Sequence, residues 1–318
     1  MNAELKMNKN RIQLRKRSKW TQMKNDIFLY ILLLPTIAVI LFFSYLPMPG
    51  LLMAFMDYDI IKGFKSDWVG FANIVEIFKN PDMYGAIWNT LKLNILGLII
   101  CHPIPIIFAL LLNEVKNSVF KRTIQTISYL PHFLSWISVI GIAFAIYAVY
   151  GPVNDFRLWL MGQPLTAGDR IMFLADPKLF IPNVLGLGLW KEMGWSSIIY
   201  LAALTAIDPQ LYEASYMDGA NKFKQAVHIT IPGIMPTVIM LLILRMGNML
   251  RSNFELIYGL QNPFVNFEVI STIIYKYGIN GGRFSQATAF GFVDGMIAFL
   301  LVFVTNKISK KISEISIW

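Results

Sequence analysis

Two groups of polar residues in this chain have types and spacings suited to chemistry, and both lie beside long apolar segments. The first is the segment Asp208–Pro236, which reads DPQLYEASYMDGANKFKQAVHITIPGIMP. The second comprises Arg245, Asn248, Ser252 and Glu255, whose offsets of three, seven and ten would place them on one face of a continuous helix. Side chains of these types pair with charged groups of a partner protein or hydrogen-bond to a polar solute.

The elements that must position these residues are membrane-spanning helices. Hydrophobic residues make up 56% of the 318 residues and charged residues only 15%, against roughly a quarter charged in an average soluble domain. The apolar residues come in blocks of roughly twenty, the length that crosses about 30 Å of hydrocarbon as a helix. Barrel-type alternation is absent, so the sequence predicts an all-α integral membrane protein with six transmembrane helices. The predicted spans, within a membrane domain at residues 27–305, are residues 27–47, 93–112, 127–150, 184–207, 234–256 and 286–305.

The distribution of Lys and Arg predicts the orientation of these helices. An even number of spans puts both termini on one side, and that side would hold sixteen Lys and Arg residues against eight on the other. By the positive-inside rule we expect the basic tail at residues 1–26, the loop at residues 208–233 and the tail at residues 306–318 to be cytoplasmic. The net charge of +9 then reflects contact with anionic lipid head groups, and nucleic-acid binding is not expected.

Several other readings are disfavoured by the sequence. The first apolar block is long and lacks a small-residue cleavage site after it, so it is predicted to be an uncleaved span. Cys101 is the single cysteine, and the three histidines are scattered, so neither a disulfide nor a metal site is expected. No Gly-x-x-x-x-Gly-Lys-Ser/Thr loop occurs that would cradle ATP phosphates. A lipid-linked glycosyltransferase would need supported carboxylates near an interface, and Asp57 with Asp59 is the only close acidic pair there. We therefore predict that the chain is not an enzyme and binds no cofactor itself.

The segment Asp208–Pro236 is predicted to form two short helices. Asp208 can accept early backbone amides, and Pro209 suits the first helical position. The first helix would run through Met217 and break near Gly219, and the second would occupy residues 221–230. Small residues let a partner approach closely, and an exposed acid can pair with a basic side chain of that partner. These residues are Ala214, Ser215 and Ala220, with Glu213 as the acid.

This segment resembles the EAA loop of type I ABC importer permeases, whose pattern is Glu-Ala-Ala, a later Gly, and then Ile-x-Leu-Pro. The corresponding residues are Glu213-Ala214-Ser215, Gly219 and Ile229-Thr230-Ile231-Pro232. The sequence departs from the pattern at Ser215 and Ile231, and Ala226 stands where many members have Phe. Further segments are similar to polysaccharide permeases of the LplB type: Tyr129–Trp136, Trp190–Trp195, Asn253–Glu255, Gln261–Pro263 and Asn306–Ser309.

The resemblance implies a type I ABC importer permease fold with a cytoplasmic EAA coupling helix, in a bacterial plasma membrane. It implies a permease subunit that translocates a carbohydrate, such as a complex oligosaccharide. The implied partners are a second homologous permease, an extracellular solute-binding lipoprotein, and an ABC ATPase dimer that binds the ATP and Mg. The implied coupling residues are Glu213, Ala214, Ser215, Asp218, Gly219, Ala220 and Pro232. An ion-coupled secondary transporter is the alternative; it would explain buried charges but not this loop.

The substrate path is predicted from polar and aromatic residues within the spans, because charges at that depth usually face a cavity or a partner. Asn248 and Glu255 would hydrogen-bond to sugar hydroxyls, and Trp190 or Trp195 would stack on a pyranose face. The alternative is that these side chains only hold helices together. The full set of candidates is Trp190, Glu192, Trp195, Arg245, Asn248, Arg251, Ser252, Glu255 and Asp294.

Two further expectations concern pairing and the outer surface. Arg245 and Asp294 are expected at matched depth near mid-bilayer and are predicted to form an ion pair. Lys191 and Glu192 are expected at roughly the depth of Arg251 and could pair similarly. The outer segments Asp57–Asn89 and Tyr150–Asn183 are rich in turn formers and carry Trp68 and Trp159 as interfacial belt residues. These segments are either a docking surface for a binding protein or ordinary connectors.

Overall fold

The computed structural model describes residues 26–164 and 167–313. In them the chain is largely helical, with one two-stranded sheet. The chain divides into two compact units, Met1–Leu52 and Met53–Trp318, which are described separately. The predicted tail at residues 1–26 lies almost wholly outside the described residues, as do the last residues of the predicted tail at 306–318. The predicted membrane domain at residues 27–305 falls across both units, and its bounds remain a prediction.

The first unit carries one apolar helix. It begins as α2 (Ile27–Ile40) and continues through the π-helical turn η1 (Leu41–Tyr45) into the 3₁₀ segment η2 (Met48–Phe55), which runs on into the second unit. None of the residues of α2 is buried, although nearly all are apolar. A helix that is apolar all round and uncovered by its own chain is suited to lipid or to a partner helix in the membrane.

The second unit begins with a small hairpin and a short helix. These elements are β1 (Met56–Asp57), η3 (Gly63–Lys65), β2 (Asp67–Trp68) and α3 (Ala72–Lys79). In the hairpin loop, the Asp59 carboxylate accepts the backbone N–H of Ile61 at 2.7 Å. Asp59 therefore stabilises a turn, which is the ordinary use of an aspartate in a loop.

The second predicted span is a pair of helices joined at a proline. Asn80 caps α4 (Pro81–Cys101) by accepting the Asp82 amide at 3.0 Å, and Pro103 starts α5 (Pro103–Glu114) after a single intervening residue. The apolar stretch from α4 through α5 covers 34 residues, so it is longer than the predicted residues 93–112. The N–H groups of the first helical turn have no partner within the helix, so a proline at the first position loses no hydrogen bond. The chain can therefore become helical again directly at Pro103.

The prediction of residues 127–150 as one continuous helix is wrong. The chain forms α6 (Ser118–Tyr129), the 3₁₀ turn η4 (Leu130–Phe133) and α7 (Trp136–Ile146), and the two helical parts are bent by 105°. Pro131 lies inside the turn, and Ser135 caps α7 by accepting the amide of Ser138 at 3.1 Å. A proline and a new N-cap within five residues end one helix and begin another.

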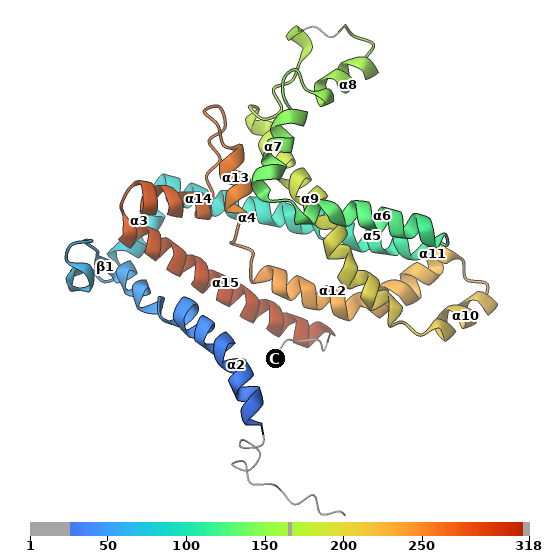
Figure 1. The fold of residues 1–318 in the computed structure, drawn as a ribbon, viewed down its shortest axis with the longest axis horizontal. Coiled ribbons are helices and arrows are strands. Elements are labelled where there is room, and N and C mark those ends of the chain that lie inside the picture. The colour runs from blue at the N-terminus through green and yellow to red at the C-terminus, as the bar shows by residue number, and fades with distance from the viewer. Residues whose placement is uncertain (1–25, 165–166, 314–318) are drawn as a thin grey trace, which may run out of the picture. The chain divides into compact units, whose positions relative to one another are not determined.

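The outer segment and the fourth predicted span follow. They comprise α8 (Pro152–Leu160), η5 (Ala167–Asp169) and the 29-residue helix α9 (Pro177–Thr205). In the second unit, α9 packs against α5 and α6 (Figure 1). It carries Lys191 and Glu192 in its middle.

The prediction of residues 234–256 as one helix is also wrong. The remaining elements are α10 (Pro209–Met217), α11 (Lys222–Gln225), the π-turn η6 (Ala226–Thr230), α12 (Ile231–Met246), α13 (Phe254–Leu260), α14 (Ile270–Tyr275), the π-turn η7 (Lys276–Asn280) and α15 (Phe284–Ser313). Because α12 ends at Met246 and α13 begins at Phe254, the residues between them are not helical. Arg245, Asn248, Ser252 and Glu255 therefore do not share one helical face. The Asn253 side chain caps α13 by accepting the Leu256 amide at 2.9 Å, which fixes where the chain becomes helical again.

Within the described residues, four helices are long and apolar enough to cross a membrane, and the bent α6–α7 pair is a fifth candidate. The four are Ile27–Phe55, Pro81–Glu114, Lys222–Met246 and Phe284–Lys311. Helix α9 is long enough but is not one of the four. The structure thus contains the predicted multi-span helical architecture, while the count of six spans remains a prediction.

Candidate functional site

The loop between α9 and α12 has the two-helix form that its caps predict. Asp208 accepts the backbone N–H of Gln210 at 2.9 Å, and Asn221 accepts the backbone N–H of Lys224 at 2.9 Å. Between the two helices, Gly219 has a φ of +75°. That conformation costs other residues roughly 1–2 kcal/mol because a Cβ would crowd the following carbonyl. The glycine therefore fixes the angle between α10 and α11.

A hydrogen-bonded network ties α10 to the base of α12. The Tyr212 hydroxyl lies 3.0 Å from the Thr230 hydroxyl, and the Gln225 amide donates to the Ser215 hydroxyl at 3.0 Å. The Ser215 hydroxyl in turn donates to the Tyr212 carbonyl at 2.8 Å. Gln225 and Thr230 are buried, so these bonds are shielded from water. Ser215 departs from the EAA pattern and uses its hydroxyl in this network.

The outer surface of α10 is exposed and partly apolar. Glu213 and Ala214 are both exposed, as is Asp218, whereas Ser215 and Ala220 are half-buried. A hollow of about 770 Å³ lies against the helix and is lined by Glu213, Ala214, Tyr216, Met217 and Lys222 among others. Tyr216 is 74% exposed and Met217 84% exposed. Exposed aromatic and methionine side chains around one carboxylate are the surface expected of a protein-docking site.

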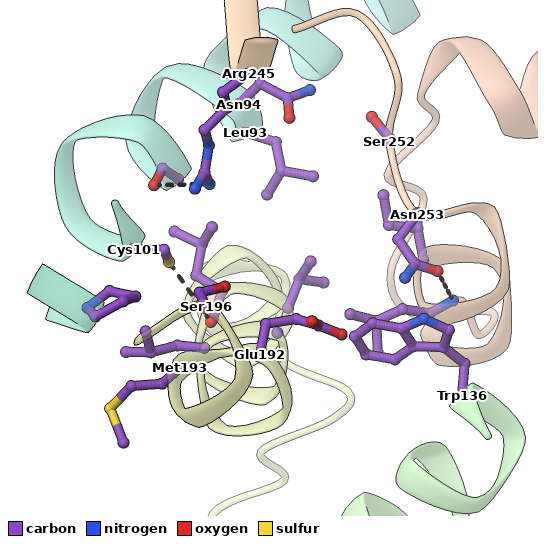
Figure 2. Close-up of a pocket in the computed structure, with 18 residues that line it drawn as sticks. Leu93, Asn94, Cys101, Trp136, Glu192, Met193, Ser196, Arg245, Ser252 and Asn253 are labelled. Carbon is purple, nitrogen blue, oxygen red and sulfur yellow. Dashed lines mark hydrogen bonds between the residues drawn. The ribbon is translucent and has the colours of Figure 1, made fainter. Parts of the chain in front are cut away.

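A second site is a cavity of about 320 Å³ among α4, α7, α9 and the break after α12. Of the predicted path residues, Glu192, Arg245 and Ser252 line it. Figure 2 shows Arg245 and Glu192 reaching into it from opposite sides, with Ser252 and Asn253 on a third side. A volume of this size is at the lower end of the range of about 300–1,000 Å³ typical of ligand pockets.

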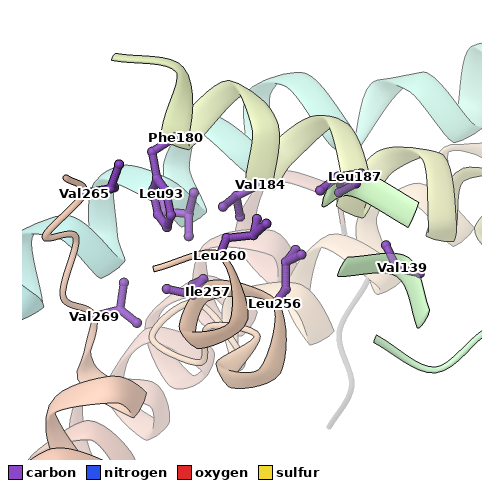
Figure 3. Close-up of a cluster of buried hydrophobic side chains, with 11 residues drawn as sticks. Leu93, Val139, Phe180, Val184, Leu187, Leu256, Ile257, Leu260, Val265 and Val269 are labelled. Atoms are coloured by element: carbon purple, nitrogen blue, oxygen red, sulfur yellow. The ribbon is translucent and has the colours of Figure 1, made fainter. Parts of the chain in front are cut away.

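The wall of this cavity is fixed by a cluster of buried apolar side chains. Leu93 of α4, Val184 of α9, and Leu256 and Ile257 of α13 belong to that cluster and also line the cavity. Figure 3 shows these side chains together with Phe180 and Val139, which belong to the same cluster. Packing of this density holds the polar groups of the cavity in fixed positions.

A smaller cavity of about 200 Å³ adjoins the first and shares Arg245 and Asn94 with it. Asn248 and Arg251, two more predicted path residues, line this cavity. Trp190, Trp195, Glu255 and Asp294 line neither cavity. The structure thus brings together five of the nine predicted path residues: Glu192, Arg245, Asn248, Arg251 and Ser252.

The predicted ion pair between Arg245 and Asp294 is absent from the described residues. The Arg245 guanidinium donates to the backbone carbonyl of Gly97 at 3.2 Å. One carboxylate oxygen of Asp294 is buried and has no hydrogen-bond partner there, and the basic residue that acts on this carboxyl is Arg251. Two residues at similar depth can still point to different sides of their helices. Arg245 is in the last turn of α12 and points towards Gly97 of α4, not towards Asp294.

Glu192 is held by basic groups at the α6–α7 break. His132 Nδ1 lies 2.9 Å from one Glu192 oxygen, and Lys191 Nζ lies 3.6 Å from the other. Lys191 is buried, and its ammonium donates to the His132 carbonyl at 2.6 Å and lies 5.1 Å from the centre of the Trp136 ring. The ammonium thus satisfies a backbone carbonyl near the bend. Among the described residues Glu192 pairs with Lys191 and His132 and not with Arg251, and the predicted match in depth with Arg251 stays a prediction.

Three of the predicted tryptophans stack on other rings of the chain. Trp195 stacks on the His132 ring, with 4.4 Å between the ring centroids, and so supports the cluster around Glu192. On the outer segments, Trp68 stacks on Phe55 and Trp159 on Phe156, and both tryptophans are largely exposed. Their role as belt residues remains a prediction.

Sequence reasoning missed several residues of the site. Asn94, Ser196 and Asn253 line the larger cavity, and His132 orients Glu192. Asn94 is detectable as an amide within an apolar block, since an intramembrane polar group is costly unless it has a function. His132 could not have been found in this way, because its partner lies 60 residues away in the chain. Among the described residues, no group of three or more His, Cys, Asp or Glu side chains has the arrangement of a metal site.

Several apolar helices, a cavity among them lined by both apolar and polar side chains, and an exposed helix in the loop after α9 indicate a membrane-embedded transport protein. The chain belongs to the family of binding-protein-dependent transport system inner membrane components, whose family model matches residues 102–312. Members of this family are transport permease subunits.

The chain is similar to curated proteins over most of its length. Protein LplB of Bacillus subtilis (strain 168) is 42% identical over 296 residues, which cover 92% of this chain and 91% of that protein. The polygalacturonan/rhamnogalacturonan transport system permease protein YteP of the same organism is 40% identical over 294 residues, covering 92% and 90%. The sequence-based resemblance to ABC importer permeases is thus confirmed.

Two solved structures have the same fold. One is a bacterial ABC transporter involved in the import of the acidic polysaccharide alginate, with a TM-score of 0.84 at 38% identity, covering 93% of this chain and 99% of that chain. The other is a bacterial alginate ABC transporter in complex with an alginate pentasaccharide-bound periplasmic protein, also with a TM-score of 0.84 at 38% identity, covering 94% and 99%. The type I ABC importer permease fold predicted from the sequence is therefore confirmed.

Proposed function

We propose that this chain is the permease subunit of an ATP-driven oligosaccharide importer, and that α10 is the helix on which an ATPase subunit acts. Family membership and the likeness to polysaccharide importers support this function. The observation that carries the coupling role is the exposed face of α10, with Glu213 beside a hollow of about 770 Å³.

The proposed mechanism assigns separate tasks to the two sites. An ATPase dimer, which binds the ATP and Mg, docks on α10 and moves it when the dimer closes. The network of Tyr212, Ser215, Gln225 and Thr230 transmits the movement to α12, because its bonds tie the two elements together. A second permease subunit completes the path, and a binding protein delivers the oligosaccharide from outside. The chain lies in a bacterial plasma membrane with α10 on the cytoplasmic side, as its Lys and Arg distribution favours.

The larger cavity is the proposed part of the substrate path within this chain. Amide, hydroxyl and guanidinium groups at Asn94, Ser252 and Arg245 offer hydrogen bonds to a hydrated solute. A break in a membrane helix is tolerated where the backbone lines a cavity, and residues between α12 and α13 line the two cavities.

The test measures ATP-dependent uptake of labelled oligosaccharides by cells that express Glu213→Ala, together with recovery of the ATPase on purifying the chain. A hydrogen bond to a charged group contributes about 1.5–3 kcal/mol, so uptake should fall by about tenfold or more. Asp82→Ala removes an exposed acid in the first turn of α4 and is the matched control. Wild-type uptake by Glu213→Ala, or uptake that persists without ATP, would refute the proposal; the second result would favour an ion-coupled transporter.

A further inference from the structure

A further pocket lies where the chain turns between α13 and η7. It has a volume of about 610 Å³, within the range of about 300–1,000 Å³ typical of ligand pockets. None of its lining residues lines the two cavities described above. The segment Gln261–Pro263, which is part of the resemblance to polysaccharide permeases, thus belongs to a site outside the proposed substrate path. The polar residues that line the pocket are Tyr258, Gln261, Asn262, Asn266, Glu268 and Lys276.

The loop that forms this pocket is held in a fixed shape by its amide side chains. The Asn262 side chain accepts the backbone N–H of Phe264 at 3.0 Å and donates to the carbonyl of Leu174 at 2.7 Å. The Gln261 side chain donates to the carbonyl of Phe267, also at 2.7 Å. The lining groups are therefore in position before a ligand arrives, which lowers the entropic cost of binding.

The charged groups of the pocket neutralise each other. One carboxylate oxygen of Glu268 pairs with the Lys276 ammonium, and the other accepts the Thr272 hydroxyl at 2.7 Å. The Glu268 side chain is only 14% exposed, so water screens this pair weakly. Among the described residues that line the pocket, no other is charged. The pocket therefore offers no net charge to attract an ion, and it favours an uncharged polar ligand.

The remaining groups match the two kinds of surface that a sugar ring presents. The Asn266 side chain and the Gln261 amide oxygen make no hydrogen bond to the described residues, so both are open to hydroxyl groups. Tyr258 lines the pocket and is 39% exposed, and Phe254 supports its ring by stacking at 5.2 Å between centroids. A tyrosine combines an apolar ring with a polar hydroxyl. A sugar ring likewise has an apolar C–H face and a rim of hydroxyl groups.

The pocket lies beside the segments that are predicted to face outward. Its loop is bonded to Leu174, which belongs to the outer segment Tyr150–Asn183. Helix α13 lines this pocket with Tyr258 and lines the larger cavity with Leu256 and Ile257. One short helix therefore connects the two sites.

We propose that this pocket binds an uncharged sugar residue, with Tyr258 against the ring and with Gln261 and Asn266 hydrogen-bonding to its hydroxyl groups. The inference rests on the proposed transport function. It adds a second saccharide site, at which the cargo binds before it enters the larger cavity.

The test uses β-1,4-galactotriose, a neutral trisaccharide, and the purified complex that contains the full-length chain. Equilibrium dialysis with the radiolabelled sugar gives the affinity, and amide hydrogen exchange locates the site. The sugar should slow exchange in the peptide that covers residues 258–268. Tyr258→Ala and Asn266→Ala should each weaken binding at this site by about two- to tenfold, because they remove an aromatic contact and a neutral hydrogen bond. Both variants should also lose the protection of this peptide.

Two control variants separate sugar recognition from structural damage. Tyr258→Phe keeps the ring and should bind the sugar as the wild type does. Asn280→Ala removes an exposed asparagine of η7 that lines none of the pockets described above, and it should also bind as the wild type does. Asn266 is exposed and its side chain makes no hydrogen bond to the described residues, so Asn266→Ala should leave the fold intact.

Four results would overturn the inference: no binding to the wild type, protection only outside residues 258–268, unchanged affinity in Tyr258→Ala and Asn266→Ala, or equal losses in Tyr258→Phe and Tyr258→Ala. Protection that requires a solute-binding protein and not the sugar would also overturn it, since the loop would then be a protein-docking surface. If the wild type still takes up saccharides in an ATP-dependent manner in these cases, the proposed function stands and only the second site fails.

Discussion

Replacing Gly194 by alanine should force α6 and α9 apart. Gly194 is buried in the middle of α9, where a Cβ would overlap with the backbone carbonyl of Ser128 on α6 and lie 3.0 Å from the Ser128 Cβ. Ordinary van der Waals contacts of a Cβ begin at 3.4 Å. Because the obstacle is backbone, no side-chain rotation relieves the overlap, and one of the two helices must move.

The expected cost combines two opposing effects. Overpacking a well-packed interior costs about 1–3 kcal/mol, and the higher helix propensity of alanine returns about 1 kcal/mol. The overpacking cost minus the propensity gain leaves a net destabilisation of up to about 2 kcal/mol. We expect a value near that upper limit, because a backbone carbonyl cannot move aside as a side chain can. The thermal unfolding midpoint of the purified permease complex in detergent measures this loss, and uptake should fall with it.

Gly186→Ala is the matched control for this change. Gly186 lies on the same helix and a Cβ there meets nothing within 4 Å. The same substitution should therefore add up to about 1 kcal/mol of stability through the helix propensity of alanine. The thermal unfolding midpoint should be unchanged or higher. Equal midpoints for the two variants would refute the close contact between α6 and α9, and with it the bent arrangement of α6 and α7.

Three further changes test other features. Lys191→Met should reduce the yield of folded chain, since it removes the ammonium's bond to the His132 carbonyl, and a hydrogen bond to a charged group contributes about 1.5–3 kcal/mol. A normal yield with a normal midpoint would contradict its role at the bend. Gly219→Val should abolish ATP-coupled uptake while the chain still inserts, because its φ of +75° disfavours a β-branched residue, and unimpaired uptake would argue against a fixed angle there. Asn154→Ala should make the chain at Ile171 more sensitive to protease, because the buried Asn154 amide donates to the carbonyls of Val149 and Ile171 at 3.1 and 2.9 Å. Unchanged cleavage there would contradict this.

The form of the coupling loop was predictable because its determinants are local. Asp208 before a proline, Gly219 and Asn221 each specify a cap or a turn through their own conformational preferences. The structure has α10, the left-handed glycine and α11 at those positions. The hydrogen bonds that tie this loop to the start of α12 were not predicted. Ser215 in place of the alanine of the EAA pattern changes the side-chain size only slightly, and the sequence does not show that its hydroxyl bonds to Gln225.

The breaks within the membrane segments were not predictable in the same way. A block of apolar residues indicates a length of buried chain but not whether the chain stays helical, and residues 247–253 contain no proline to mark the end of α12. Gly247 is the one local sign; a Cβ there would lie 2.6 Å from Val302 of α15, so the glycine permits a close helix contact. Arg245 likewise finds its acceptor on Gly97, 148 residues away, which no periodicity in the sequence encodes.

The interruption between α12 and α13 has a mechanical consequence. A continuous helix would transmit movement of its first turns to its last turns, whereas the non-helical residues 247–253 form a joint at which α12 and α13 can turn separately. Force applied below the joint would tilt α12 and leave α13 seated in the apolar cluster with α7 and α9. Under the proposed mechanism Arg245, on the last turn of α12 before the joint, would then move relative to the residues of α13 that line the same cavity.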